Sequence, residues 1–191
     1  FSIVPSDAFN TMKNLQALSI EYAESFSHIE LKCLLNLKWL RFSLSSHEIP
    51  LFHEVNPDLL VFDFYLTSGT QFYSKVFEKF NFHKVKAFLF LETFGIFNFD
   101  LDWLNGENSE HSRQEINGLN DSTKTSRISS LKYLELSCLN SLRGSWSRFE
   151  NLQTISLYSI SSFELYAGMF NGLVNLKTLL LKHIINSDEI L

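Results

Sequence analysis

The sequence predicts an α/β solenoid, a right-handed superhelix of stacked repeats with a parallel sheet on its concave side. Three observations support this prediction. One apolar pattern occurs seven times, its copies follow a near-constant period, and a second apolar pattern with three-residue spacing precedes several of them. A single short unit of this kind cannot bury its apolar edge, so neighbouring units must stack against one another.

The repeated pattern is Leu-x-x-Leu-x-Leu, with other apolar residues in place of some leucines. Its copies are NLQALSI, NLKWLRF, DLLVFDF, KVKAFLF, SLKYLEL, NLQTISL and NLKTLLL, whose first apolar positions are residues 15, 37, 59, 85, 131, 152 and 176. The steps between these positions are 22, 22, 26, 46, 21 and 24 residues. Leucine-rich repeats have periods of about 20 to 29 residues, so the step of 46 indicates two periods, one of them degenerate or replaced by a loop.

Each copy predicts a short strand, because alternate residues of an extended chain point to the same side. Apolar residues also recur six and three positions before the first leucine, in the sets Phe9/Met12/Leu15, Leu31/Leu34/Leu37, Trp146/Phe149/Leu152 and Phe170/Leu173/Leu176. This spacing suits helix or 3₁₀ turns on the convex side. Both halves direct apolar groups into one narrow core, which the 19 phenylalanines make unusually aromatic.

Residues 105–127 interrupt the pattern with a polar, glycine-containing stretch that predicts a surface loop. The chain is therefore expected to be a single leucine-rich repeat array over residues 1–191, with about seven or eight repeats and this loop inserted. The loop holds the sequon Asn120-Asp121-Ser122, so Asn120 is a candidate glycosylation site if the protein is secreted. Phe1 and Leu191 both fall inside repeats without a cysteine-rich cap, so we expect a fragment of a larger protein.

Composition and motifs give no support for catalysis, a cofactor or a metal. The net charge is −5, which does not favour a nucleic-acid partner. HEIPL and HEVNP lack the second histidine of a zinc-protease helix, because Leu51 and Pro57 stand there. Cys33 and Cys138 lie in copies several repeats apart, beyond disulfide reach, so we expect partly buried free thiols.

The stretches FSIVPSDAFNTMKNLQALSI and MFNGLVNLKTLLL resemble the leucine-rich repeats of animal extracellular proteins, in which an apolar-x-x-apolar-Pro turn precedes a Phe and the leucine positions. At the level of repeats, the resemblance is to part of a Toll-like-receptor type ectodomain. It implies a binding module of an innate-immune or cell-surface receptor, an extracellular glycoprotein acting in signal transduction. Membrane attachment would then come only through parts of the protein outside this chain.

The family's asparagine, three residues beyond the last leucine of each copy, is missing throughout. Those positions hold Ala23, Ser45, Thr67, Thr93, Leu139, Ile160 and Ile184. Hydroxyl groups replace part of the function of an asparagine amide, but Ala, Leu and Ile do not. At those turns the backbone must find other partners or the turn must open, because buried unpaired amides are costly. The sequence therefore predicts an irregular solenoid without an asparagine ladder.

The solenoid also predicts which residues face a ligand, because the residues between the leucines of each strand point outward in rows. Arg41 and Asp63 fall in the same row on adjacent strands, so we expect them to pair. Exposed aromatic residues are typical anchors of protein interfaces. The candidate binding residues on the concave face are Trp39, Arg41, Asp63, Tyr65, Tyr133, Glu135, Tyr158 and Lys182. The alternative is that the aromatic residues pack on one another or under the polar loop.

Three functions are consistent with these patterns. The first is a receptor module, extracellular or at the cell surface, that binds a protein, microbial or peptide ligand. The second is a cytoplasmic adaptor such as a substrate-recognition subunit of a ubiquitin ligase, suggested by LELSC, in which Cys138 lies one residue early for a cysteine-containing repeat. The third is a non-functional or decoy fragment, because relaxed selection also leaves eroded repeats.

Overall fold

The computed structural model describes residues 8–23, 33–44, 59–66, 84–93, 98–104 and 130–184. Within these ranges one short helix and nine strands follow one another. In chain order they are β1 (Ala17–Ala23), β2 (Trp39–Leu44), β3 (Val61–Leu66), β4 (Ala87–Glu92), β5 (Asn98–Asp100), α2 (Leu101–Leu104), β6 (Tyr133–Ser137), β7 (Ser141–Arg143), β8 (Thr154–Tyr158) and β9 (Thr178–Lys182).

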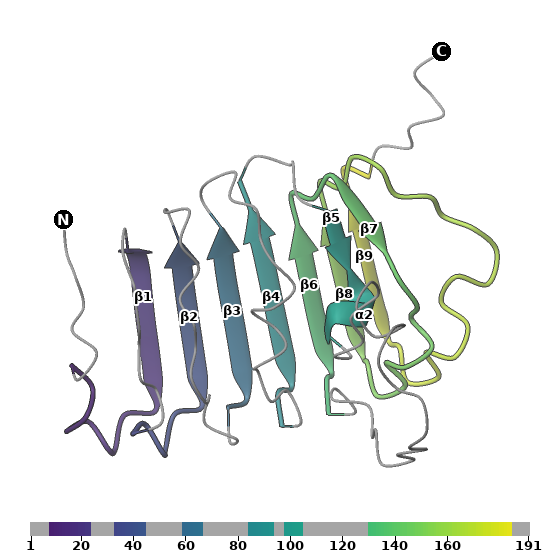
Figure 1. The fold of residues 1–191 in the computed structure, drawn as a ribbon. Coiled ribbons are helices and arrows are strands. Elements are labelled where there is room, and N and C mark those ends of the chain that lie inside the picture. Colours follow the sequence, from purple (N-terminus) through teal and green to yellow (C-terminus); the bar gives the residue numbers. More distant parts are fainter. Residues whose placement is uncertain are drawn as a thin grey trace, which may run out of the picture.

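The main sheet is parallel and has the order β1-β2-β3-β4-β6-β8-β9 (Figure 1). Each of these strands is one copy of the Leu-x-x-Leu-x-Leu pattern, so the predicted parallel solenoid is confirmed. Strand β4 pairs directly with β6, with Ala87 opposite Tyr133. The step of 46 residues therefore adds no strand to the main sheet. The predicted loop at 105–127, with Asn120, lies outside the described residues.

A second, two-stranded parallel sheet forms where β5 pairs with β7. Its edge is held by Asn98, whose Oδ1 accepts hydrogen bonds from Asn140 Nδ2 at 2.8 Å and Ser141 Oγ at 2.6 Å. Gly144 follows β7 with a φ of 100°, and a Cβ at this position would lie 2.7 Å from Asp100 Oδ1 and 2.9 Å from Leu101 N. Glycine at 144 thus permits β7 to pass close to the start of α2.

The core between the main sheet and the turns is aromatic on β2, β3 and β4. Phe62 and Phe64 of β3 pack on Phe88 and Phe90 of β4, with ring centroids 5.8 and 5.7 Å apart. Phe99 of β5 contacts both rings of β4, at 6.3 Å from Phe88 and 5.2 Å from Phe90. All five rings are buried, and full burial of one such side chain stabilises the fold by roughly 1.5–3 kcal/mol.

The turns that enter the strands follow the predicted three-residue spacing. Their backbone N–H groups donate to the carbonyl three residues earlier, as Phe149 does to Trp146 at 3.0 Å and Leu152 to Phe149 at 2.9 Å. The same bonds link Phe9, Met12 and Leu15, and also Phe170, Leu173 and Leu176. In the part of the chain that the structure describes, α2 is the one helix and has four residues. The helical content expected of an α/β solenoid stays a prediction.

Successive turns are joined by one recurring backbone contact at the start of each strand. The carbonyl of Gln16 accepts hydrogen bonds from the N–H groups of both Lys38, at 2.8 Å, and Trp39, at 3.0 Å. The corresponding acceptors in later turns are the carbonyls of Lys38, Leu60, Lys86, Lys132 and Gln153. Side-chain amides add to this link, because Asn36 donates to Lys13 O and Asn175 donates to Glu150 O, both at 2.9 Å.

At the missing asparagine ladder, the described turns use backbone partners instead. Leu139 and Ile160 are fully buried, so these positions fill the core with apolar side chains. The preceding residues, Cys138 and Ser159, have positive φ values of 58° and 53°. Their N–H groups donate to Tyr158 O at 2.8 Å and Lys182 O at 2.9 Å in the next turn. In these two turns the backbone N–H groups therefore find other backbone partners, and the turn does not open. The left-handed conformation that this requires is strained for residues other than glycine.

Both cysteines are free and half-buried, as predicted from their spacing. Burial raises the pKa of the Cys138 thiol, and the carboxylate of Glu92 raises it further. A protonated thiol is a poor nucleophile and metal ligand. No described helix is long and apolar enough to cross a membrane.

Candidate ligand-binding face

The strand residues that point away from the core form three rows, on what we call the outer face of the main sheet. The pairing register places Trp39, Val61, Ala87, Tyr133, Thr154 and Thr178 in the first row, and Arg41, Asp63, Leu89, Glu135, Ser156 and Leu180 in the second. The third row holds Ser43, Tyr65, Leu91, Ser137, Tyr158 and Lys182. These rows are the ones predicted from the repeat.

The repeat also predicts Glu21 beside Ser43 in the third row, and here the structure differs. The pairing of β1 with β2 shifts between Ile20 and Ala23, so Glu21 lies in a bulge and is not paired opposite Ser43. An extra residue in one strand re-aims the side chains at that point. The bulge leaves the Glu21 carboxylate within reach of Arg41.

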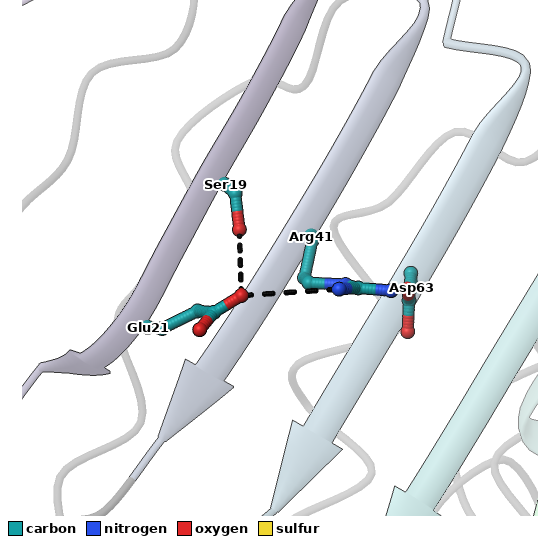
Figure 2. A network of polar contacts seen from close by, with 4 residues as sticks. All are labelled: Ser19, Glu21, Arg41 and Asp63. Carbon is teal, nitrogen blue, oxygen red and sulfur yellow. Dashed lines mark hydrogen bonds and ion pairs between the residues drawn. The ribbon is translucent and has the colours of Figure 1, made fainter.

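A polar cluster joins β1, β2 and β3 around Arg41 (Figure 2). Arg41 Nε and Nη2 each lie 2.7 Å from Asp63 Oδ2, which confirms the predicted cross-strand pair. Glu21 Oε1 lies 3.8 Å from Arg41 Nη1 and accepts a hydrogen bond from Ser19 Oγ at 3.1 Å. On its other side Arg41 stacks over Trp39, with Cζ 5.3 Å from the ring centroid, a cation–π contact.

A second polar pair lies on β6, where the Tyr133 hydroxyl donates a hydrogen bond to Glu135 Oε2. Partial burial, this hydrogen bond and the negative charge of Glu135 together raise the pKa of Tyr133 to about 12. The phenol is protonated at neutral pH, and its hydrogen bond orients the Glu135 carboxylate.

Between these two groups the outer face has a hollow of about 340 Å³, which we call the outer hollow. Its lining residues are Glu21, Arg41, Ser43, Asp63, Tyr65, Leu89, Phe90, Leu91 and Glu135. Half-buried Leu89 and Leu91 give it an apolar floor, and three carboxylates against one guanidinium give it a surplus of negative charge. Cavities of this size, apolar with a few placed polar groups, are typical of ligand sites.

Ser43 is the unusual member of the outer hollow. It is 2% exposed, and its Oγ is the buried side-chain oxygen that has no hydrogen-bond partner among the described residues. A buried hydroxyl without a partner costs about 1–3 kcal/mol. A bound water, an ion or a ligand group are the kinds of partner that satisfy such a hydroxyl.

The outer hollow brings together four of the predicted binding residues, Arg41, Asp63, Tyr65 and Glu135. Trp39 and Tyr133 do not line it but contact Arg41 and Glu135, respectively. Tyr158 and Lys182 lie opposite each other on β8 and β9, outside the hollow, where Tyr158 contacts the His183 ring. Packing of these aromatic residues on one another is not seen among the described ring contacts, where Trp39 and Tyr133 have polar partners. The other half of that alternative, packing under the polar loop at 105–127, falls outside the described residues.

Sequence reasoning missed Glu21, Ser43, Leu89 and Leu91 as members of the site. Their rows were predictable, but the β1 bulge and the burial of Ser43 depend on neighbouring side chains. Sequence reasoning also missed a row of lysines at the strand starts. Each lysine directly follows the first apolar residue of a repeat, in the triplets NLK, KVK, SLK and NLK, and they are Lys38, Lys86, Lys132 and Lys177. Of the carboxylates of the outer hollow, Glu135 follows one of these lysines, Lys132, by three residues.

The described residues contain no group of three or more His, Cys, Asp or Glu side chains that could hold a metal ion. The outer hollow also contains no histidine or cysteine as a nucleophile or base. Its lining groups offer charge, hydrogen bonds and apolar contact.

The stacked turns define a parallel β-solenoid, a fold consistent with that of leucine-rich repeat proteins. No protein-family model matches the sequence, and no curated protein sequence matches it. Solved structures do match, among them the crystal structure of the TLR13–ssRNA13 complex, in which TLR13 is a Toll-like receptor.

The TLR13 likeness has a TM-score of 0.57 at 18% sequence identity. It covers 97% of this chain and 24% of the receptor chain, so this chain spans about a quarter of the receptor's length. At this identity the likeness shows the fold alone. The ssRNA13 ligand belongs to TLR13, and the expectation that this chain has no nucleic-acid partner stays a prediction.

Proposed function

We propose that this chain is a leucine-rich repeat binding module, part of the ectodomain of an innate-immune or cell-surface receptor. It forms one α/β array over residues 1–191, with the right-handed superhelical form of such arrays and the polar loop at 105–127 inserted. Its ligand is a protein or peptide bound across the outer face, which is the predicted concave side. The fold shared with a Toll-like receptor supports this proposal.

The observation that carries the proposal is the outer hollow with the unpaired Ser43 hydroxyl in it. Tyr65 lines one side of the hollow and Tyr133 holds Glu135 at the other. Aromatic side chains at such positions supply much of the binding energy of protein interfaces. The ligand therefore contacts strands β2 to β6.

The test is a comparison of affinity-tagged chain 1–191 with two variants. Tyr65→Ala/Tyr133→Ala alters the outer face, and Val174→Ser alters a turn residue that is 83% exposed. Proteins captured from extracellular fluid by the original chain are identified by mass spectrometry and then measured individually against all three chains. We expect the double variant to lose affinity at least tenfold and Val174→Ser to retain it. Equal affinity of all three chains would place the binding site off the outer face.

The extracellular location has a separate test at Asn120. Expression through the secretory pathway of animal cells, followed by peptide:N-glycosidase treatment, should show a mobility shift that Asn120→Gln abolishes. A secreted chain that is folded but carries no glycan would remove this support for the receptor assignment and favour the adaptor alternative.

A further inference from the structure

The ligand chemistry follows from the charges of the outer hollow, if the proposed binding function holds. Arg41 contacts Asp63 through two nitrogen atoms at 2.7 Å, so most of its charge is matched by that carboxylate. Glu21, 3.8 Å from Arg41, and Glu135, bonded to a neutral phenol, keep most of their negative charge. Carboxylates that line a concave surface attract cationic groups and disfavour anionic ones.

The two surplus carboxylates lie at opposite ends of the outer hollow. Glu21 and the unpaired Ser43 hydroxyl are on β1 and β2, whereas Glu135 is on β6. Strands β2 and β6 are three spacings apart in the sheet order, which corresponds to about 14 Å at about 4.8 Å per spacing. An extended peptide rises about 3.4 Å per residue, so side chains at positions i and i+4 span about the same distance and point to the same side.

Two strands lie between the ends of this path, β3 with Asp63 and Tyr65, and β4 with apolar residues. Leu89 of β4 lies between Asp63 and Glu135 in the second row, and Leu91 lies beside it in the third. Both are half-buried and line the hollow. The side chain at position i+2 of the same peptide would lie over them, so an apolar residue fits there.

We propose that the outer hollow binds an extended polypeptide segment with cationic side chains at positions i and i+4 and an apolar side chain at i+2. An ammonium group at one end pairs with Glu21 and, where binding displaces the side chains that cover Ser43, donates to Ser43 Oγ, and the other ammonium group pairs with Glu135. Ser43 thereby gains the hydrogen-bond partner that it lacks among the described residues. A lysine suits the first position, because its compact ammonium carries three donors on an apolar stem.

The test uses three fluorescein-labelled nonapeptides and fluorescence anisotropy with chain 1–191. KALAKALAK has the proposed spacing, KKKALAALA has the same composition with its lysines clustered, and EALAEALAE has the opposite charge. We expect KALAKALAK to bind most tightly, KKKALAALA at least fivefold more weakly, and EALAEALAE not at all. Equal binding of the two lysine peptides would show that charge alone acts and would overturn the proposed spacing.

Two variants locate the binding in the outer hollow. Ser43→Ala and Glu135→Gln should each weaken KALAKALAK binding about five- to tenfold, corresponding to one lost hydrogen bond or ion pair. Ser156→Ala, in the second row outside the hollow, and Glu150→Gln, on an exposed turn, serve as controls and should stay within twofold. Unchanged binding in Ser43→Ala and Glu135→Gln would overturn the proposal.

The stability of Ser43→Ala separates ligand recognition from a structural role. If the hydroxyl serves a ligand, its removal relieves an unpaired buried group, so the urea midpoint of the free protein rises while affinity for KALAKALAK falls. A fall in both would show that Ser43 serves the fold and would overturn its assigned role.

An oligouridylate of ten nucleotides tests the competing polyanion ligand at the lysine row. Binding of this RNA, lost in Lys86→Gln/Lys132→Gln, together with no binding of KALAKALAK, would overturn the proposal. Failure of the proposed function would give a different result, because the affinity of captured partner proteins would then be unchanged in Tyr65→Ala/Tyr133→Ala. If they remain sensitive while KALAKALAK does not bind, the binding module stands and the basic-peptide ligand is wrong.

Discussion

The Arg41–Asp63 pair gives an asymmetric prediction, because its two partners differ in exposure. The Asp63 side chain is 14% exposed, and the Arg41 side chain is 45% exposed. Arg41→Met keeps most of the apolar stem but leaves a largely buried carboxylate without its cation. Asp63→Asn leaves a guanidinium that water can still reach. Removing the exposed partner should therefore destabilise the protein more than neutralising the buried one.

The magnitudes follow from the environment of the group left behind. Arg41→Met should lower the free energy of unfolding by about 1–3 kcal/mol, the cost of an unsatisfied buried polar group. It also loses the stacking on Trp39, which contributes about 0.5–1 kcal/mol at an exposed site. Asp63→Asn should cost about 0.2–1 kcal/mol, the range for a solvent-exposed ion pair.

Urea unfolding followed by far-UV circular dichroism measures both variants and the double variant. With a denaturant slope of about 2–3 kcal/mol/M, Arg41→Met should lower the midpoint by about 0.5–2 M, and Asp63→Asn by less than half of that. The double variant should be more stable than Arg41→Met alone, because its buried carboxylate is gone. A cost for Asp63→Asn equal to or above that of Arg41→Met would refute the reasoning from exposure.

Three further predictions concern other parts of the described structure. Ser159→Val should lower the free energy of unfolding by about 1–2 kcal/mol, because a β-branched residue is strained at a φ of 53°. Ser161→Val, at an exposed position two residues further on, should change it by less than about 0.5 kcal/mol. Equal urea midpoints of the two variants would count against a left-handed turn. Phe99→Leu should cost about 1–3 kcal/mol for two lost ring contacts, and Phe9→Leu at a partly buried site should cost less than half as much in the same assay. Tyr133 should titrate near pH 12 when the 295 nm absorbance of Tyr133→Phe is subtracted, and Glu135→Gln should lower this pKa toward 10. Because the pKa of Tyr133 is raised by folding, the folded chain keeps a proton that the unfolded chain loses between about pH 10 and 12. The contribution of this proton to stability is therefore complete below pH 10 and disappears as the pH rises through 12. Titration of Tyr133 near pH 10 in the unaltered protein would contradict the Glu135 contact.

The repeat pattern was sufficient to predict the seven strands of the main sheet and, apart from the bulge in β1, their register, whereas it did not predict β5, β7 and their separate sheet. Leu134 and Leu136, for example, are buried where alternation requires it, and Glu135 between them faces outward. Because parallel stacking of equal units fixes which residues lie side by side, the pairing of Arg41 with Asp63 followed from a separation of one period. The same logic placed the aromatic residues of the outer face in their rows.

The features that could not be predicted depend on contacts between side chains or on local irregularity. The bulge at Glu21 breaks the two-residue alternation on which the row prediction relied. The burial of Ser43 depends on the bulk of Tyr65, Leu91 and the other lining groups, which the spacing of leucines does not encode. The positive φ of Cys138 and Ser159 lies outside the usual preference of these residues, so no local sequence signal revealed it.

At the start of each strand, two N–H groups donate to one carbonyl of the preceding turn, and this has a consequence for redesign of the outer face. These contacts use only main-chain atoms, so they are formed equally well by Trp39, Val61, Ala87, Tyr133 and Thr154. Most side chains that secure the array point inward, whereas on the outer face the contacts of Arg41 with Glu21 and Asp63 join neighbouring turns. A library that keeps these three residues and randomises the other positions of the second and third rows should therefore yield many folded members, and new binding specificities could be selected from this scaffold without re-engineering its core.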